Sequence, residues 1–197
     1  MVKNYELYVI LDATAAADAR TNEIAKIESM IKEDFGADKV KVNDQGSKKL
    51  AYPIKKARLG HYVLFSFDLP VENSARVAGF EKKLNVSDFV TRYLLTDMTE
   101  HNELVSKQSL NKKTEVKNHQ DLNKGRITTK QDVLKHLGYK TVDYKDVELL
   151  TQFVSPYHKI FNRKRVGNSA KTQRMISQAV KRARHMALMA FTPKHEA

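Results

Sequence analysis

The chain has no cysteine among its 197 residues. This absence excludes disulfide bonds, zinc sites built on thiolates and cysteine nucleophiles, and it fits a reducing compartment. No apolar run approaches the roughly 18 residues that a membrane-spanning helix needs. The first residues, MVKNYELYVILD, lack the charged region and long apolar stretch of a secretory signal. We therefore expect a cytoplasmic protein with no membrane partner.

Sequence motifs of catalysis are also missing. The phosphate-binding patterns GxxxxGK[ST] and GxGxxG are absent, and the seven histidines form no HExxH or similar metal-binding pair. Asp143 and Asp146 precede an apolar run, which favours helix capping over paired catalytic carboxylates. His61 lies in a predicted strand, where a packed or surface histidine is the commoner case. We expect no enzymatic activity, no cofactor, no metal and no small-molecule substrate.

Negative charge is scarce in the C-terminal half. Residues 1–110 hold 16 Lys or Arg and 16 Asp or Glu, residues 111–140 hold 8 and 3, and residues 141–197 hold 11 and 4. The whole formal net charge of +12 therefore lies after residue 110. A charge that served solubility alone need not gather in one half. The asymmetry indicates a nucleic acid or another anionic surface as the partner of the C-terminal half.

Residues 1–98 alternate between strand and helix patterns. YELYVIL and HYVLFSFDL are typical of strands, DKVKV and KKLAYPIKK bracket a predicted turn at DQGS, and DFVTRYLLTDM is the last strand. Helix spacing predicts one helix from Ala16 to Phe35, ended by Gly36, and a second from about Glu72 to Leu84. The order β-α-β-β-α-β is that of the ferredoxin-like fold, in the α+β class.

Both faces of the predicted sheet carry apolar side chains. The two helices can cover only one face, and a polar second face would be expected if it met water. The second face instead requires a cover, either a protein segment or stacked bases. The residues we expect to pack against another module on this face are Tyr8, Ile10, Tyr62, Leu64, Val90 and Leu94.

Residues 99–140 are polar and basic and are predicted to be a linker, with a short helix at 130–137. Residues 141–197 are predicted to form a small, basic, mainly helical module. Its first helix has Asp143 as a plausible N-cap and Pro156 as its stop. The basic connector HKIFNRKRVGNSAK follows, and Asn168 or Ser169 can cap the final helix.

The final helix has two distinct faces. Ile176, Val180, Ala183 and Ala187 fall on one side, and the opposite side holds Lys171, Arg174, Gln178, Arg182 and His185, flanked by Lys181 and Arg184. No Asp or Glu occurs between residues 171 and 191. Cations without acidic neighbours repel one another unless an anion neutralises them. This pattern is typical of binding to a phosphate backbone.

Two segments of the chain resemble known families. LAYPI after a GSKK turn, GHYVLFSF and VTRYLL resemble the bacterial small-subunit ribosomal protein six family over about residues 3–98. DYKDVELLTQFVSPYHKI, RKRVGNSAKTQR and AVKRARHMALMAF resemble small-subunit ribosomal protein eighteen over about residues 141–192. The resemblance implies a natural or engineered fusion of two proteins that form a heterodimer on the central domain, or platform, of the small-subunit ribosomal RNA.

The same resemblance implies which residues contact RNA. The family's basic connector corresponds to Lys159, Arg163 and Lys164, and its terminal helix to Lys171, Gln173, Arg174, Lys181, Arg182 and Arg184. The charge pattern adds Arg165 and His185. The implied partners are the ribosomal RNA and neighbouring small-subunit proteins, and the implied location is the ribosome. A departure is the lack of the cysteines with which some members could bind zinc.

Two other interpretations remain open at this point. An RNA-recognition motif shares the strand and helix order, and its signatures are partly matched by Leu7–Val9 and by Arg58 with residues 62–65, although Leu59 and Gly60 depart from them. Its sheet aromatics would stack on bases. A DNA-binding or ribosome-assembly factor outside the ribosome could use the same basic helix.

Overall fold

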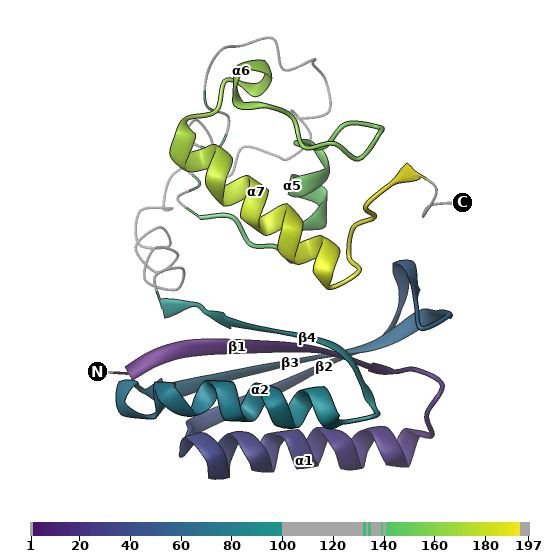
Figure 1. The fold of residues 1–197 in the computed structure, drawn as a ribbon, viewed down its shortest axis with the longest axis vertical. Helices are drawn as coiled ribbons and strands as arrows, with labels where there is room; N and C mark the ends of the chain where they lie inside the picture. The colour runs from purple at the N-terminus through teal and green to yellow at the C-terminus, as the bar shows by residue number, and fades with distance from the viewer. Residues whose placement is uncertain (1, 100–131, 133, 135–138, 140, 194–197) are drawn as a thin grey trace, which may run out of the picture. The chain divides into compact units, whose positions relative to one another are not determined.

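The computed structural model describes residues 2–99, 132, 134, 139 and 141–193. The chain divides into two compact units, Met1–Glu100 and His101–Ala197, which we call the N-terminal and C-terminal units (Figure 1). Each unit is described by itself.

The N-terminal unit is a four-stranded antiparallel sheet covered by helices on one face (Figure 1). The strand order is β2-β3-β1-β4. The elements in chain order are β1 (Val2–Asp12), α1 (Ala17–Phe35), β2 (Asp38–Ile54), β3 (Ala57–Pro70), the 3₁₀ helix η1 (Val71–Arg76), α2 (Val77–Val86) and β4 (Val90–Asp97). The predicted ferredoxin-like arrangement is confirmed.

Strand β2 is longer than predicted because DQGS does not form a turn. The strand continues through it, and its register with β3 shifts between Asp44 and Gly46. Gly46 has a φ of 75°, and its amide donates to Asp44 Oδ1 at 2.8 Å. A left-handed glycine in this position is typical of a β-bulge. The chain instead reverses at Lys55 and Lys56, whose φ values of 48° and 70° suit a tight hairpin turn.

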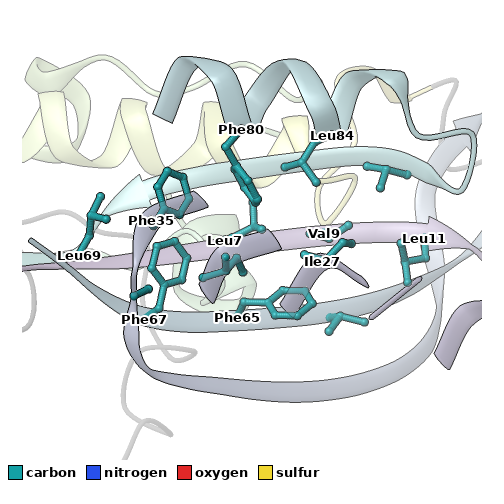
Figure 2. Close-up of a cluster of buried hydrophobic side chains, with 14 residues drawn as sticks. Leu7, Val9, Leu11, Ile27, Phe35, Phe65, Phe67, Leu69, Phe80 and Leu84 are labelled. Atoms are coloured by element: carbon teal, nitrogen blue, oxygen red, sulfur yellow. The ribbon is translucent and has the colours of Figure 1, made fainter. Parts of the chain in front are cut away.

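The main core lies between the sheet and the two helices (Figure 2). Helix α1 contributes Ile27, Ile31 and Phe35, and α2 contributes Phe80 and Leu84, at the spacings that predicted these faces. Their partners on the strands include Leu7, Val9, Phe65, Phe67 and Leu69. The ring of Phe35 lies 4.8 Å from that of Phe80 and 5.8 Å from that of Phe67, between centroids. Tertiary burial therefore fixes both helices on the sheet.

One helix of this unit ends where the sequence predicts, and the other begins differently. Gly36 ends α1 in a left-handed conformation with a φ of 56°, as its position predicted. The second predicted helix begins as the 3₁₀ turn η1 and becomes α-helical only at Val77. The buried residues of α2 are Phe80 and Leu84, which face the core, whereas Val71 in η1 is exposed.

The C-terminal unit contains α5 (Val147–Thr151), α6 (Arg163–Val166) and α7 (Ala170–His185), together with an isolated β-bridge between Val154 and Ile160. Helix α5 is shorter than predicted. Its N-cap is Asp146, whose carboxylate accepts from the Leu149 amide at 3.1 Å, and it ends well before Pro156. The sequence predicted no helix in the basic connector, but the connector contains α6.

The predicted linker at 99–140 and its short helix at 130–137 lie outside the described residues, apart from Thr99, Asp132, Leu134 and Tyr139. Leu134 is helical and buried. In the part of the chain that the structure describes, no helix has the length and apolar character needed to cross a membrane.

Candidate RNA-binding surface

Helix α7 separates buried and cationic residues as its sequence predicted. Ile176, Val180 and Ala183 have no exposed surface. The exposed residues of the helix include Lys171, Arg174, Gln178, Lys181 and His185, and Arg182 is partly exposed. Ala187, predicted to extend the apolar face, is buried but lies just beyond the helix, with a φ of 51°. We call Lys171, Arg174, Lys181 and Arg182, with the exposed His185 beside them, the cationic face.

The N-terminus of α7 is closed by two side chains. Ser169 is the N-cap, and its hydroxyl accepts from the Thr172 amide at 3.2 Å. Asp132, from the predicted linker, accepts from the Ser169 amide at 3.0 Å and from the Thr172 hydroxyl at 2.7 Å. A carboxylate here also interacts favourably with the helix dipole. Because Asp132 occupies this terminus, phosphate groups would have to be bound by side chains.

Helix α6 presents three consecutive cations. Arg163, Lys164 and Arg165 are all exposed. Asn162 caps the helix, since its side-chain oxygen accepts from the Arg165 amide at 2.9 Å, and Gly167 ends it with a φ of 78°. The short helix therefore fixes the backbone from which these side chains project.

A hairpin at residues 153–161 precedes α6. The Phe161 amide donates to the Phe153 carbonyl at 2.9 Å, and the Ser155 amide donates to the Lys159 carbonyl at 2.8 Å. Lys159, one of the predicted RNA contacts, is exposed at its tip. The tip is tied to α7, because Arg184 donates from Nη2 to the carbonyl oxygen of His158.

Gln173 and Arg184, both predicted RNA contacts, have hydrogen-bond partners within the unit. Gln173 donates to the Phe161 carbonyl at 2.8 Å and accepts from Asn168 at 3.1 Å, so it holds the connector against α7. Arg184 donates to His158 and lies over the ring of Phe191, 5.8 Å from its centroid. Burial lowers the pKa of Arg184 below its ordinary value. Both side chains therefore stabilise the packing of the connector and the hairpin against α7.

Acidic residues are scarce in the sequence that carries these cations. Within residues 141–193, an ion pair joins Lys145 Nζ to Asp143 Oδ2 at 3.3 Å, away from the final helix. The sequence has no Asp or Glu from residue 149 to residue 195. A surface built this way is electrostatically unfavourable alone and favours a polyanion.

The N-terminal unit presents a second apolar surface, on the sheet face opposite the helices. Tyr8 pairs with Leu64 on β3 and with Leu94 on β4, and Ile10 pairs with Tyr62, so these residues share that face. Tyr8, Ile10 and Tyr62 are buried, whereas Leu64 and Leu94 are partly exposed. We call these five residues the second apolar face.

The prediction that Val90 shares a face with Leu94 is wrong. Strand β4 shifts register by one residue at Thr91 relative to β1. This bulge reverses the alternation of side chains. Val90 is therefore turned toward the helices, where it belongs to the main core.

The geometry argues against an RNA-recognition motif. Phe65, which that interpretation would need for base stacking, lies in the main core under the helices. Tyr8 is buried, packs 5.4 Å from the Tyr62 ring and donates its hydroxyl proton to Gln45 at 2.8 Å. Burial raises the pKa of Tyr62 above its ordinary range. The sheet aromatics therefore act as packing residues.

Comparisons with known proteins agree with this division. The family model for ribosomal protein S6 matches residues 4–97, and that for ribosomal protein S18 matches residues 138–189. The small ribosomal subunit protein bS18 of Staphylococcus aureus, strains JH9 and Newman, is 48% identical over 59 residues, or 30% of this chain and 74% of the relative. The crystal structure of 30S ribosomal protein S6 from Thermotoga maritima is 23% identical in sequence and has a TM-score of 0.49. The match covers 55% of this chain and 99% of that chain.

The two family matches define a small-subunit ribosomal protein. More particularly, the chain belongs to the ribosomal protein S6 family through its N-terminal unit and to the ribosomal protein S18 family through its C-terminal unit, and it is a fusion of the two. Both families consist of structural proteins of the ribosome and not of enzymes.

Three features that shape the surface were not predicted from the sequence: a short capped helix, a turn and a long-range contact. Asn162 followed five positions later by Gly167 is a signal for a short capped helix, and it could have been found. The Pro156-Tyr157 pair could have been recognised as a turn. Asp132 gave no such signal, because its contacts with Ser169 and Thr172 join segments 37 and 40 residues apart.

Proposed function

We propose that the protein binds the central domain, or platform, of the small-subunit ribosomal RNA and fixes its geometry, acting on the ribosome in the cytoplasm. The observation that carries this proposal is the cationic face of α7, joined by the exposed cations of α6 and Lys159. These side chains neutralise phosphates and release counterions. Arginine adds bidentate and stacking contacts with RNA.

The test is the salt dependence of binding to a transcript of the central domain. The variant K171Q/R174Q/K181Q changes three exposed residues of the cationic face. A matched control, K41Q/K49Q/K82Q, removes the same charge from exposed positions of the N-terminal unit. Each lost phosphate contact should reduce the slope of log K against log salt by about 0.7 to 0.9.

We expect the first variant to bind more weakly and to lose about 2 to 3 units of slope, whereas the control should change the slope less. Equal slopes for the wild type and the first variant would refute the assignment. Binding by the wild type that survives molar salt would refute phosphate neutralisation itself.

We further propose that the two units pack together as an intramolecular equivalent of the S6–S18 heterodimer, through the second apolar face. The support comes from the N-terminal unit alone. Leu64 and Leu94 add partly exposed aliphatic surface beside three buried apolar side chains, on the face that no helix of the unit covers. An apolar sheet face of this kind is stabilised by a partner surface.

The experiment is to cut the folded chain at a protease site introduced near residue 115 and to follow both fragments by size-exclusion chromatography. The fragments should co-elute, and L64D/L94D should separate them. The control V86D changes a residue that is 81% exposed on α2 and should leave them together. Fragments that separate without any substitution would contradict this proposal and leave the RNA-binding proposal standing.

A further inference from the structure

The tip of the 153–161 hairpin is unusually well fixed for an exposed loop. The His158 amide donates to the Ser155 carbonyl at 2.8 Å, and the Lys159 amide donates to the Ser155 hydroxyl at 3.1 Å. Arg184 holds the His158 carbonyl from α7. The three-residue connection 156–158 therefore has its backbone determined by bonds at both ends and from a neighbouring element.

The tip is built at a conformational cost. His158 has a φ of 59°, in the left-handed region that glycine usually occupies in such hairpins. A side chain with a β-carbon is unfavourable in this region. Pro156 occupies the first central position, where its ring presets the backbone angle. Backbone strain that the surrounding bonds enforce is concentrated at functional sites.

Tyr157 lies at the centre of this tip and is 76% exposed. A single exposed aromatic residue is ordinary on protein surfaces. This one differs because the turn that carries it is fixed, because exposed Lys159 lies two residues away, and because the surrounding sequence has no acid from residue 149 to residue 195. An aromatic ring among cations suits a nucleic acid, whose bases stack while its phosphates are neutralised.

We propose that Tyr157 is a stacking platform for an unpaired base of the RNA that the C-terminal unit binds. This inference rests on the proposed function and adds a contact of a different kind. The ring would stack on the base, and Lys159 would bind the adjoining phosphate. Every base has a π-face, so the site should tolerate different bases. Because the turn is already ordered, little conformational entropy is lost on binding.

The chain has no tryptophan, which gives a direct optical test. In the full-length Y157W variant, the indole is the single tryptophan and reports on position 157 alone. Addition of the central-domain transcript should quench its fluorescence, because a stacked base quenches an indole. The control F89W places a tryptophan at a residue that is 39% exposed in the N-terminal unit, and it should be quenched much less.

Binding measurements separate stacking from apolar burial. Y157F keeps the ring and should bind the transcript within about twofold of the wild type. Y157L keeps apolar bulk without a π-face and should bind about 5- to 150-fold more weakly, the range expected for one lost base stack. The slope against salt should be unchanged in Y157L, because no charge is removed, and its melting temperature should match the wild type.

The outcomes distinguish the two proposals. Quenching of Y157W together with weak binding by Y157L supports the stacking site. Salt-dependent binding by the wild type with an unquenched Y157W, or with Y157L binding as well as Y157F, overturns the stacking site and leaves the proposed function intact. Failure of the wild type to bind the transcript overturns both.

Discussion

At the scale of single residues, two arginines on one helix have different roles despite equal charge. Arg174 is exposed on the cationic face, whereas Arg184 is partly buried, donates to the His158 carbonyl and contacts the Phe191 ring. R184A should therefore destabilise the unit by about 1.5 to 3 kcal/mol, the range for a hydrogen bond with a charged group. R174A should leave stability within about 0.5 kcal/mol of the wild type, as exposed surface substitutions do.

Urea denaturation measures the stability of each variant. The slope of RNA affinity against salt measures the loss of phosphate contacts. R174A should lose slope while R184A chiefly loses stability. R184K is the informative control, because it keeps the charge without the planar guanidinium. If both R184K and R184A were as stable as the wild type, the inference that Arg184 stabilises the C-terminal unit would be wrong.

A second prediction at this scale concerns acid stability. The backbone amide of Thr14 donates to Asp12 Oδ1 at 2.8 Å and its hydroxyl donates at 2.7 Å, and these bonds hold the pKa of Asp12 below its ordinary value of 3.8. A carboxyl whose pKa is lower in the folded state stabilises the fold above its unfolded pKa. That stabilisation is lost as the pH falls through the folded pKa.

The comparison of the wild type with D12N checks this sign. The wild type should be more stable by a constant amount above about pH 5, and the difference should shrink as the pH falls below 3.8. Urea titrations at several pH values give the curve. A difference that grew with acidification would show that the charged carboxylate is unfavourable in the folded protein.

At the scale of elements, the closure of α7 by Asp132 extends the C-terminal unit beyond the matched S18 region. That match begins at residue 138, yet Asp132 bonds to Ser169 and Thr172 at the start of the helix. D132A should destabilise the unit by about 1 to 2 kcal/mol, as other N-cap losses do. D132N should cost less, because an amide oxygen still accepts both bonds.

Thermal unfolding monitored by circular dichroism gives the order expected, with the wild type most stable, then D132N, then D132A. Q178A changes an exposed residue of α7 outside these bonds and should behave as the wild type. Identical melting curves for D132A and the wild type would place the boundary of the unit after Asp132.

The sequence predicts the long helices well and the irregularities of the strands poorly. The long helices α1 and α7 were predicted closely, because each repeats its apolar residues at helical spacing over many turns. The sequence DQGS predicts a turn, but it forms the bulge at Gly46. A glycine after Asp and Gln is compatible with a turn or a bulge, and only the pairing with β3 distinguishes the two. Val90 was assigned to the wrong face because a one-residue bulge reverses strand alternation without a sequence signal.

At the scale of the whole molecule, the separation of charge was evident from composition, since all of the net charge of +12 lies after residue 110. Composition could not show which cations are available to RNA. Hydrogen bonds within the C-terminal unit engage Gln173 and Arg184 but leave Lys171, Arg174 and Lys181 exposed. That distinction depends on the folded hairpin and connector, which only the structure reveals.

The proposed packing of the two units predicts how fusion affects RNA binding. If the units associate as proposed, their association within one chain is intramolecular, at an effective concentration of roughly millimolar for a short flexible connection and less for a longer one. The intact protein should therefore bind the central-domain transcript with a single-site curve at any dilution. After cleavage near residue 115, the units must meet before or during binding, so the midpoint should move to higher protein concentration and the curve should steepen.

Filter binding of the intact and cleaved protein at nanomolar concentrations measures this shift. The L64D/L94D variant provides the matched control, because its weakened second apolar face should make the intact protein behave more like the cleaved one. If cleavage left both midpoint and slope unchanged, the C-terminal unit would bind RNA without help from the N-terminal unit. The covalent connection would then fix only the one-to-one stoichiometry of the two proteins and not their affinity for RNA.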